Sequence, residues 1–580
     1  MKKFVRLICG LCLVPLLAVM IQMMLPVPQA GLEATKVGDS HWVFEGGEMV
    51  LNQGIPTLTV AGSEYEMGLQ YGVLLKDKLH AINGESRGFL RQLMPWYAKP
   101  FSNFYFNWQA ARIKDRIPPA YQEELRGIAA GAGLREREVW LFASFPEIFL
   151  GCTSILARID DEVILARNLD FLPFLGKYPV VVHYDPIGKT AFTSIGVAGY
   201  GGVLTGFNTA GIGLSLNTIV MEETTPSKEV LMGYQNRHLL ETAGSLKETD
   251  EVLRDFSSEV GWAVTIASRA DHNGAVYEIA SSGTRKHPLD DRDFLAVNNS
   301  FLDEDLRHRH MGVLTAANFR NQGRHEALKA QLQENPVSYR DDLLDLLASV
   351  RFYAYDDIGL GLGHYTVNNE QTIQSILLDT HHSEFWLAVG QGFAGFSPFL
   401  RYEFQGSASF YREGRQETPV LELLEHRDRI MERYLAREYQ GLADMIRGME
   451  SPGRYEMAGL AELMLEENVA LDCDWLMAMI EVERTRFDQL PELAIARARI
   501  LLAQERWAEA AETMTAALDM PHLYAADQVM LYRYLAEALH KTGDQEKAYD
   551  YAKKCLAMIE AYALGEDEEA LVEAVRPYLE

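Results

Sequence analysis

The sequence changes its pattern at the junction Gly151-Cys152. Upstream, residues 51–150 carry mostly helical patterns, with one amphipathic run opening at Ser63 and another ending at Gly133. Downstream, apolar or alternating segments separated by glycine and proline indicate β-strands. If the chain cuts itself at this junction, Cys152 acquires both a thiol nucleophile and a free backbone amine that can serve as its base.

Strand-like and helical segments alternate after the junction. We expect strands at residues 155–159, 163–166, 180–184, 191–197, 211–216, 263–267, 275–279, 373–378 and 385–389, and helices at 232–243 and 340–347. This order is typical of sheets layered against helices, so the expected fold class is α+β.

The length of 580 residues predicts two or three domains. We expect a targeting segment at residues 1–30, a helical pro-segment or small subunit at 31–151, a β-rich core at 152–417 and a helical region at 418–580. The net charge of -28 argues against a nucleic-acid partner, because proteins that bind phosphate backbones carry basic faces.

The amino terminus resembles an export signal. Lys2, Lys3 and Arg6 precede an uncharged apolar stretch at residues 7–27. A stretch of about 20 apolar residues would also span a bilayer, and Pro28 fits poorly at the minus-three position of a cleavage site after Ala30, so an uncleaved membrane anchor is the alternative. In either case we expect the protein to be exported, with its bulk in the periplasm or outside the cell.

Few cysteines lie outside the amino-terminal segment. Cys152, Cys473 and Cys555 are too few and too scattered for a disulfide framework or a cysteine-rich zinc site. The histidine clusters His308-Arg309-His310 and His381-His382 lack the spacing of a zinc helix and are interpreted as exposed polar residues. The sequence therefore predicts no metal and no cofactor.

A thiol has a pKa near 8.5 and an α-amine titrates slightly lower, so the amine can take the thiol proton near neutral pH. The site also needs a cation and a carboxylate to orient the amine, and Arg167 and Asp170 supply both types; a surface ion pair is the alternative interpretation. A papain-like enzyme would instead need a histidine base, for which His183 and His364 remain open.

Attack on an amide also requires an oxyanion hole, and side-chain amides are suitable donors. Asn208, between two expected strands, is one candidate, although asparagine there is ordinarily a turn former. Asn298 or Asn299, after an apolar strand, is the other. Phe171, with Phe174 and Tyr178, is a candidate lining for an acyl pocket, with core packing as the alternative.

The chain resembles the acyl-coenzyme A:6-aminopenicillanic acid acyltransferase family of N-terminal-nucleophile cysteine hydrolases, which is related to the choloylglycine hydrolases. The motifs that carry the resemblance run from residue 51 to 395 in the family's order, namely residues 63–72, 125–133, 151–154, 167–170, 369–375 and 385–390. The resemblance implies a four-layer αββα sandwich, self-cleavage between Gly151 and Cys152, and an upstream piece that remains as a small subunit.

The same resemblance implies roles for individual residues. Cys152 matches the nucleophile, Arg167 the active-site arginine and Asp170 the aspartate that orients the amine, while Asn208 matches the asparagine after the third-strand turn. Asn299 matches the oxyanion donor of the family's Thr-Asn-His-Phe motif. This chain reads Asn-Asn-Ser-Phe there, which leaves Asn298 as a rival. A later family arginine that binds substrate matches Arg309, with Arg307 as the competitor.

The region after residue 418 is almost wholly helical and acidic in pattern. Two segments, beginning at Arg506 and Gly543, resemble tetratricopeptide units, although two imperfect units are fewer than a stable solenoid usually needs and a plain helical bundle is the alternative. A repeat array would offer a docking surface for a protein partner.

The leading hypothesis is an exported, self-processing cysteine amidohydrolase that cleaves linear carbon-nitrogen bonds of small acyl amides. The first alternative is an acyltransferase, in which an amine resolves the Cys152 thioester. The second is a non-enzymatic ligand-binding protein with a helical docking domain.

Overall fold

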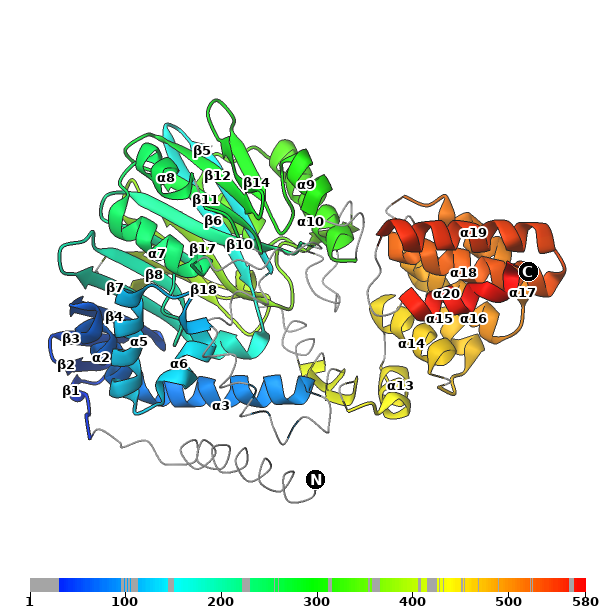
Figure 1. The fold of residues 1–580 in the computed structure, drawn as a ribbon, viewed down its shortest axis with the longest axis horizontal. Helices are drawn as coiled ribbons and strands as arrows, with labels where there is room; N and C mark the ends of the chain where they lie inside the picture. The colour runs from blue at the N-terminus through cyan, green and yellow to red at the C-terminus, as the bar shows by residue number, and fades with distance from the viewer. Residues whose placement is uncertain are drawn as a thin grey trace, which may run out of the picture. The chain divides into compact units, whose positions relative to one another are not determined.

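The computed structural model is shown in Figure 1. It describes residues 31–94, 99, 102, 105, 113–143, 151–221, 230–254, 256–258, 260–310, 316–352, 355–356, 366–404, 408–414, 425–426, 428–430, 432–434, 436–449, 452, 454–467, 469–488, 490–521, 523, 525–562 and 568–579. The chain divides into two compact units, residues 1–143 with 184–187 and residues 144–183 with 188–580.

The first unit combines an antiparallel meander with helices. Its strands are β1 (Thr35–Gly38), β2 (His41–Phe44), β3 (Gly47–Asn52) and β4 (Ile55–Gly62), and its helices are α2 (Glu64–Leu74), α3 (Lys76–Leu93), α5 (Pro119–Ala132) and α6 (Glu136–Ala143). The helical pattern expected from residue 51 therefore begins only after Gly62. Ser63 caps α2 through a capping box with Glu66, which satisfies backbone donors at the helix start.

Helices α2 and α5 touch backbone to backbone. Gly68 and Gly72 in α2 face Gly127 and Gly131 in α5, and a Cβ added at Gly68 would lie 2.1 Å from the Glu124 carbonyl oxygen. Only glycine permits this approach, since any side chain would force the helices apart. This contact explains the two glycine-containing motifs in the upstream segment.

Two antiparallel sheets form the β-rich part of the chain. The first contains, as neighbours, β7 (Pro179–Pro186), β8 (Phe192–Val197), β9 (Thr205–Asn208), β10 (Ile212–Ile219), β11 (Gly261–Ser268), β12 (Asn273–Ala280) and β13 (Gly283–Pro288). The second has the order β14 (Phe294–Val297), β5 (Gly151–Ile159), β6 (Glu162–Asp170), β17 (Thr372–Asp379), β18 (Glu384–Val389), β19 (Phe399–Glu403) and β20 (Ala408–Arg412). A short pair, β15 (Arg351–Phe352) and β16 (Tyr355–Asp356), lies apart from both.

The two sheets pack on each other and on helices. Strands β5 and β6 contact β10 and β11, and every residue of β10 and β11 is buried. Helices α7 (Met232–Thr242) and α8 (Leu246–Leu253) contact the first sheet, whereas α10 (Ala316–Glu334) and α11 (Arg340–Leu347) contact the second. The remaining short helices are α9 (Glu304–His310), η3 (Pro173–Lys177) and η4 (Ala394–Phe396). The expected α+β class is confirmed.

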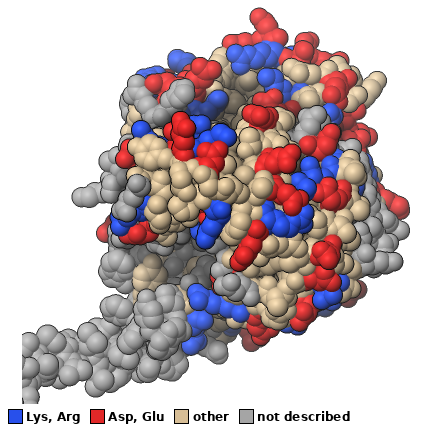
Figure 2. Space-filling model, turned by 90° about the vertical axis from the view of Figure 1, so that its right-hand side faces the viewer, with Lys and Arg blue, Asp and Glu red and all other residues tan. Residues whose placement is uncertain are grey.

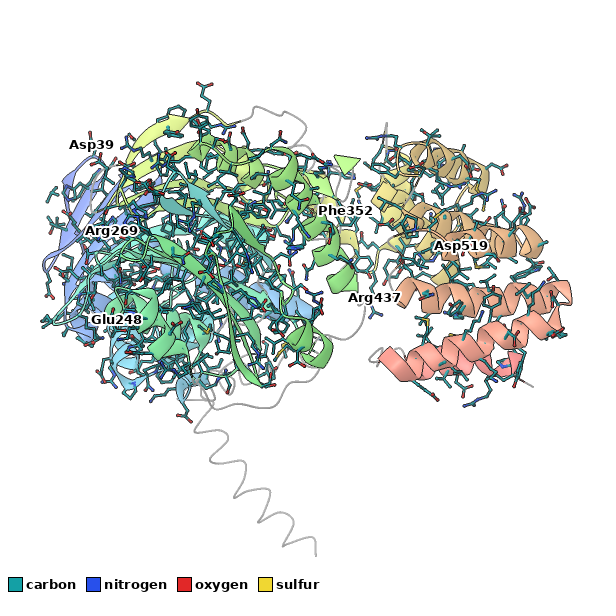
Figure 3. The ribbon with its side chains drawn as sticks, turned by 90° about the horizontal axis from the view of Figure 1, so that it is seen from above. Asp39, Glu248, Arg269, Phe352, Arg437 and Asp519 are labelled. Atoms are coloured by element: carbon teal, nitrogen blue, oxygen red, sulfur yellow. The ribbon has the colours of Figure 1, made fainter. Side chains whose placement is uncertain are left out.

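The carboxyl-terminal region is helical, as expected. Its helices are α13 (Tyr439–Arg447), α14 (Arg454–Glu466), α15 (Cys473–Arg484), α16 (Pro491–Ala503), α17 (Trp507–Leu518), α18 (Ala525–Thr542), α19 (Gln545–Tyr562), α20 (Glu568–Val575) and η6 (Arg576–Tyr578). From α14 on, each helix contacts the next along the chain, and Asp519 at the end of α17 marks this array in Figure 3. The two tetratricopeptide-like segments coincide with the starts of α17 and α19.

Lys and Arg are interspersed with Asp and Glu on the face shown in Figure 2. None of the helices in the described part of the chain combines the length and the apolar character that a membrane crossing needs. The segment at residues 1–30, on which the predicted signal or anchor falls, lies outside the described residues.

Candidate functional site

Cys152 and Arg167 come together on the paired strands β5 and β6. The Arg167 Nη2 donates a hydrogen bond to the Cys152 Sγ at 2.9 Å, and both side chains are fully buried. In the β5–β6 register Ser154 lies opposite Arg167, and Gly151 lies opposite Asp170. The structure therefore brings the predicted cation to the predicted nucleophile.

The Arg167 guanidinium reaches from the second sheet to the first. Its Nη1 donates to the Leu204 carbonyl oxygen at 2.6 Å and to the Thr205 hydroxyl, and its Nη2 donates to the Leu216 carbonyl oxygen at 2.9 Å. These acceptors fix the cation beside the thiol and contradict the alternative of a surface ion pair.

Asp170 is buried at the end of β6 and accepts hydrogen bonds from Arg324, Asn369 and Thr372. Arg324 Nη1 donates to it at 3.1 Å, Asn369 Nδ2 at 3.0 Å and the Thr372 hydroxyl at 2.6 Å. Asn369 and Thr372 belong to one of the motifs that carry the family resemblance. Their contacts hold the carboxylate of Asp170, which is the predicted partner of the Cys152 amine.

Asn299 contacts the backbone of Cys152, and Asn298 does not. The Cys152 N–H donates to the Asn299 Oδ1 at 2.9 Å, while the Asn299 Nδ2 donates to the Thr218 carbonyl oxygen at 2.6 Å. The Asn298 Nδ2 donates instead to the Asn321 carbonyl oxygen. The structure thus places Asn299 at the nucleophile, with its amide oxygen toward the atom that would become the free amine.

Arg324, in α10, is a site residue that sequence reasoning missed. It bonds to Asp170 and also donates from Nη2 to the Oδ1 atoms of Asn299 at 2.7 Å and of Asn321 at 2.8 Å. Arg324 and Asn321 lie three residues apart on one helix face. That spacing, in a helix following the Asn-Asn-Ser-Phe motif, is the only sequence signal that points to this residue.

Neither candidate for the later family arginine is shown at the site. Arg309 falls in α9, and its side chain lies outside the described residues. Its competitor Arg307 donates to the carbonyl oxygens of Phe301 and Leu302. Among the described residues, Arg324 is the arginine that contacts Asp170.

The Asn208 side chain stabilises the turn in which it lies. Its Nδ2 donates to the carbonyl oxygens of Leu240 at 2.8 Å and Ala243 at 2.7 Å, and its Oδ1 accepts from the Ile212 N–H at 2.9 Å. These bonds tie the β9–β10 turn to the end of α7. They favour the turn-forming interpretation over a role at the thiol.

His183 is not the base of a papain-like pair. Its Nδ1 pairs with the Thr193 hydroxyl at 2.8 Å, and its Nε2 has no hydrogen-bond partner among the described residues. Burial lowers the pKa of His183 to about 4. His364, the other histidine left open, lies outside the described residues.

Phe171 is almost completely buried, with 1% of its surface exposed. Its backbone N–H donates to the Gln371 carbonyl oxygen at 2.8 Å, which extends the pairing of β6 with β17. This position favours core packing over an open acyl pocket.

Gly151, the other half of the predicted cleavage bond, is the first residue of β5, and residues 144–150 before it lie outside the described residues.

The electrostatic environment keeps the Cys152 thiol protonated in the uncut chain. Burial raises the pKa of Cys152, the positive charge of Arg167 opposes that rise, and the negative charge of Asp170 adds to it. Burial also lowers the pKa of Arg324, while Asp170 counters the shift. A base must therefore take the thiol proton before Cys152 can attack a carbonyl carbon.

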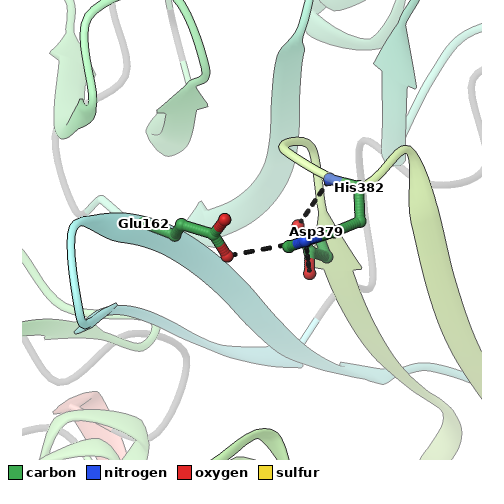
Figure 4. A group of neighbouring side chains, drawn as sticks. All are labelled: Glu162, Asp379 and His382. Carbon is green, nitrogen blue, oxygen red and sulfur yellow. Dashed lines mark hydrogen bonds and ion pairs between the residues drawn. The ribbon is translucent and has the colours of Figure 1, made fainter.

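One group of side chains among the described residues has the composition of a metal site. Glu162, Asp379 and His382 lie at the ends of β6 and β17 (Figure 4). Arg340 donates to Asp379 and pairs with Glu162 at 3.5 Å, so a guanidinium already supplies positive charge. The cluster is explained as an ion-pair network.

One family model and several curated relatives match part of this chain. Residues 157–392 match the family model described as acyl-coenzyme A:6-aminopenicillanic acid acyl-transferase. Acid ceramidase from the whale Balaenoptera acutorostrata scammoni is 33% identical over 163 residues, and human acid ceramidase is 32% identical over the same length. Each match covers 24% of this chain and 41% of the relative, so it spans about two fifths of the relatives' length. The family resemblance is confirmed.

Two solved structures are also similar. An N-acylethanolamine-hydrolyzing acid amidase ortholog from Caenorhabditis elegans has a TM-score of 0.29 at 20% identity and covers 40% of this chain and 93% of its own. A mutant conjugated bile acid hydrolase from Clostridium perfringens has a TM-score of 0.29 at 11% identity and covers 46% of this chain and 97% of its own. At these scores neither likeness supports an argument.

Proposed function

We propose that this chain, whose residues 157–392 match the acyltransferase family, is a self-processing cysteine amidohydrolase that cleaves linear acyl amides through a Cys152 thioester. The observation that carries the proposal is the buried contact between the Arg167 guanidinium and the Cys152 Sγ, with Asn299 on the Cys152 N–H. A thiol and a future amine on one residue, beside a fixed cation, are the parts that amine-assisted attack needs.

In the proposed mechanism the Cys152 Sγ first attacks the Gly151 carbonyl carbon, the acyl group passes from nitrogen to sulfur, and water hydrolyses this thioester to leave the Gly151 carboxylate and a free Cys152 amine. The new amine takes the thiol proton, and the Cys152 Sγ attacks the carbonyl carbon of the substrate amide. Asn299 donates to the oxyanion once its amide is free to turn from Thr218, the leaving amine departs with a proton, and water hydrolyses the thioester. Asp170, held by Arg324, orients the amine.

The proposed substrate is an acyl amide. Ceramide, after which the curated relatives are named, carries a fatty acyl chain on an amide nitrogen. We propose the αββα N-terminal-nucleophile arrangement for the two sheets and their helices, export through the segment at residues 1–30, and a docking role for the tetratricopeptide-like helices.

The test uses purified protein and fluorogenic N-acyl-7-amino-4-methylcoumarins whose acyl chains range from two to sixteen carbons. Wild-type protein is expected to release the coumarin, and Cys152→Ala to release none. Release at equal rates by both proteins would reject the thioester mechanism. No release by either protein from any probe would favour a ligand-binding protein.

Acyl transfer is the second candidate, since the matched family model is named for an acyltransferase. An added amine such as ethanolamine distinguishes the two reactions. A hydrolase yields free acid whatever the amine concentration, whereas a transferase yields a new amide in proportion to it. Mass spectrometry of the acyl product decides between them.

A further inference from the structure

Strand β10 supplies acceptors to the site from its backbone. The Leu216 carbonyl oxygen accepts from Arg167 Nη2 at 2.9 Å, and the Thr218 carbonyl oxygen accepts from Asn299 Nδ2 at 2.6 Å. Between these two residues stands Asn217, whose side chain is fully buried and hydrogen-bonds to Ser154, Val297 and Asn298. The proposed mechanism gives Asn217 no part.

The Asn217 side chain joins three segments of the site. Its Oδ1 accepts from the Ser154 hydroxyl at 2.7 Å, two residues after the nucleophile on β5. Its Nδ2 donates to the carbonyl oxygens of Val297 and Asn298, each at 3.2 Å. The amide therefore links β10, in the first sheet, with β5 and with the end of β14, in the second sheet.

Val297 and Asn298 directly precede Asn299, so their carbonyl groups set where the Asn299 side chain begins. The Asn217 amide fixes that backbone, while the carbonyl oxygen of the next residue, Thr218, accepts from the Asn299 amide only until that amide turns to the oxyanion. All these groups are buried. Replacing the Asn217 amide would therefore leave the carbonyl oxygens of Val297 and Asn298 without these hydrogen bonds, and no bulk water could replace them. The Asn299 segment would then shift relative to Cys152.

We propose that Asn217 is a positioning residue, which acts through the backbone of Val297 and Asn298 to hold Asn299 on the Cys152 nitrogen. This inference deepens the proposed function and rests on it. Displacing a reacting group by about 1 Å costs on the order of a hundredfold in rate. The loss should therefore appear in kcat, because the hydrogen bonds of Asn217 go to Ser154 and to the backbone that precedes Asn299.

The experiment compares Asn217→Leu, Asn217→Asp and the control Thr265→Val on the coumarin amide that wild-type protein cleaves best. Thr265 lies on β11 opposite Ser215 of β10, is fully buried, and its hydroxyl has no hydrogen-bond partner among the described residues. Thr265→Val therefore changes a buried polar group in the same sheet without removing a hydrogen bond of the site.

Asn217→Leu is expected to lower kcat roughly ten- to hundredfold with KM within about twofold of wild type. The deficit of Asn217→Asp in kcat, relative to wild type, should become smaller as the pH falls, because a protonated carboxyl regains a donor for one carbonyl oxygen. Thr265→Val should match wild type. If Asn217→Leu fails to fold, Asn217→Asp carries the test through its pH profile.

The inference is overturned if Asn217→Leu keeps kcat within twofold of wild type, or if the deficit of Asn217→Asp is the same at every pH. A wild-type protein that cleaves no probe and does not process itself would instead reject the proposed function. The two failures are therefore distinguishable.

Discussion

At the scale of single residues, the Asp170–Arg324 ion pair is the strongest constraint on the site. Both side chains are fully buried and 3.1 Å apart. Removing one partner of a buried pair leaves an uncompensated charge, which typically costs about 3–5 kcal/mol. Asp170 therefore contributes to folding as well as to the proposed chemistry.

We predict that Asp170→Asn and Arg324→Gln each lower the free energy of unfolding by about 3–5 kcal/mol, and that the double variant loses less than the sum. Urea denaturation in a Cys152→Ala background, chosen to keep the chain uncut, measures this. Strictly additive losses would show that the two charges do not compensate each other.

His183 predicts a pH dependence of stability. Its folded pKa of about 4 lies below the ordinary value near 6.5. The contribution of the neutral His183 ring to the free energy of unfolding is therefore complete above about pH 6.5 and is lost as the pH falls to about 4. The difference between the unfolded and folded pKa values corresponds to a loss of roughly 3 kcal/mol in the free energy of unfolding. Urea midpoints at pH 7, 5.5 and 4.5 should therefore fall more steeply for wild type than for His183→Gln. Equal slopes would mean that His183 titrates normally.

At the scale of secondary-structure elements, the α2–α5 contact depends on glycine. A Cβ at Gly127 would lie 2.3 Å from the Tyr65 carbonyl oxygen, whereas nothing lies within 4 Å of a Cβ at Gly84 in α3. We predict that Gly68→Ala and Gly127→Ala each destabilise the protein by about 1–3 kcal/mol. The control Gly84→Ala should stabilise it by up to about 1 kcal/mol. Thermal unfolding of these variants checks the pattern, and a harmless Gly68→Ala would contradict the close contact.

The sequence predicted the long strands better than the short ones. Strands β6, β7, β10, β11, β12, β17 and β18 fall where apolar periodicity placed them. Strand β14 matches the apolar run expected before Asn298, whereas β9 is four residues long, too short for periodicity to distinguish from a loop. Helix α10 was missed because its apolar residues show little amphipathic pattern.

The site was predictable where its residues are close in sequence. Cys152, Arg167 and Asp170 sit on one hairpin, so a local motif contains them. Arg324 and Asn217 come from distant elements and carry no motif. Only the packing of α10 against β14 and of β10 against β5 brings them to the site.

At the scale of the whole molecule, the proposed chemistry uses only groups that the chain supplies. In the proposed mechanism Cys152 provides the nucleophile and, after cleavage, its own base. Arg340 balances the carboxylates of the Glu162–Asp379–His382 cluster. We predict that dialysis against EDTA leaves amidase activity and thermal stability unchanged. Activity lost to EDTA and restored by zinc would show that a metal site operates.

The most direct test of the account is intact-mass analysis with amino-terminal sequencing of wild-type protein and of Cys152→Ala. The account predicts a wild-type fragment that begins Cys152-Thr153-Ser154 and a Cys152→Ala chain that remains uncut at this bond. A wild-type chain that stays joined between Gly151 and Cys152 while it cleaves acyl amides would contradict it, as would the same cleavage in Cys152→Ala.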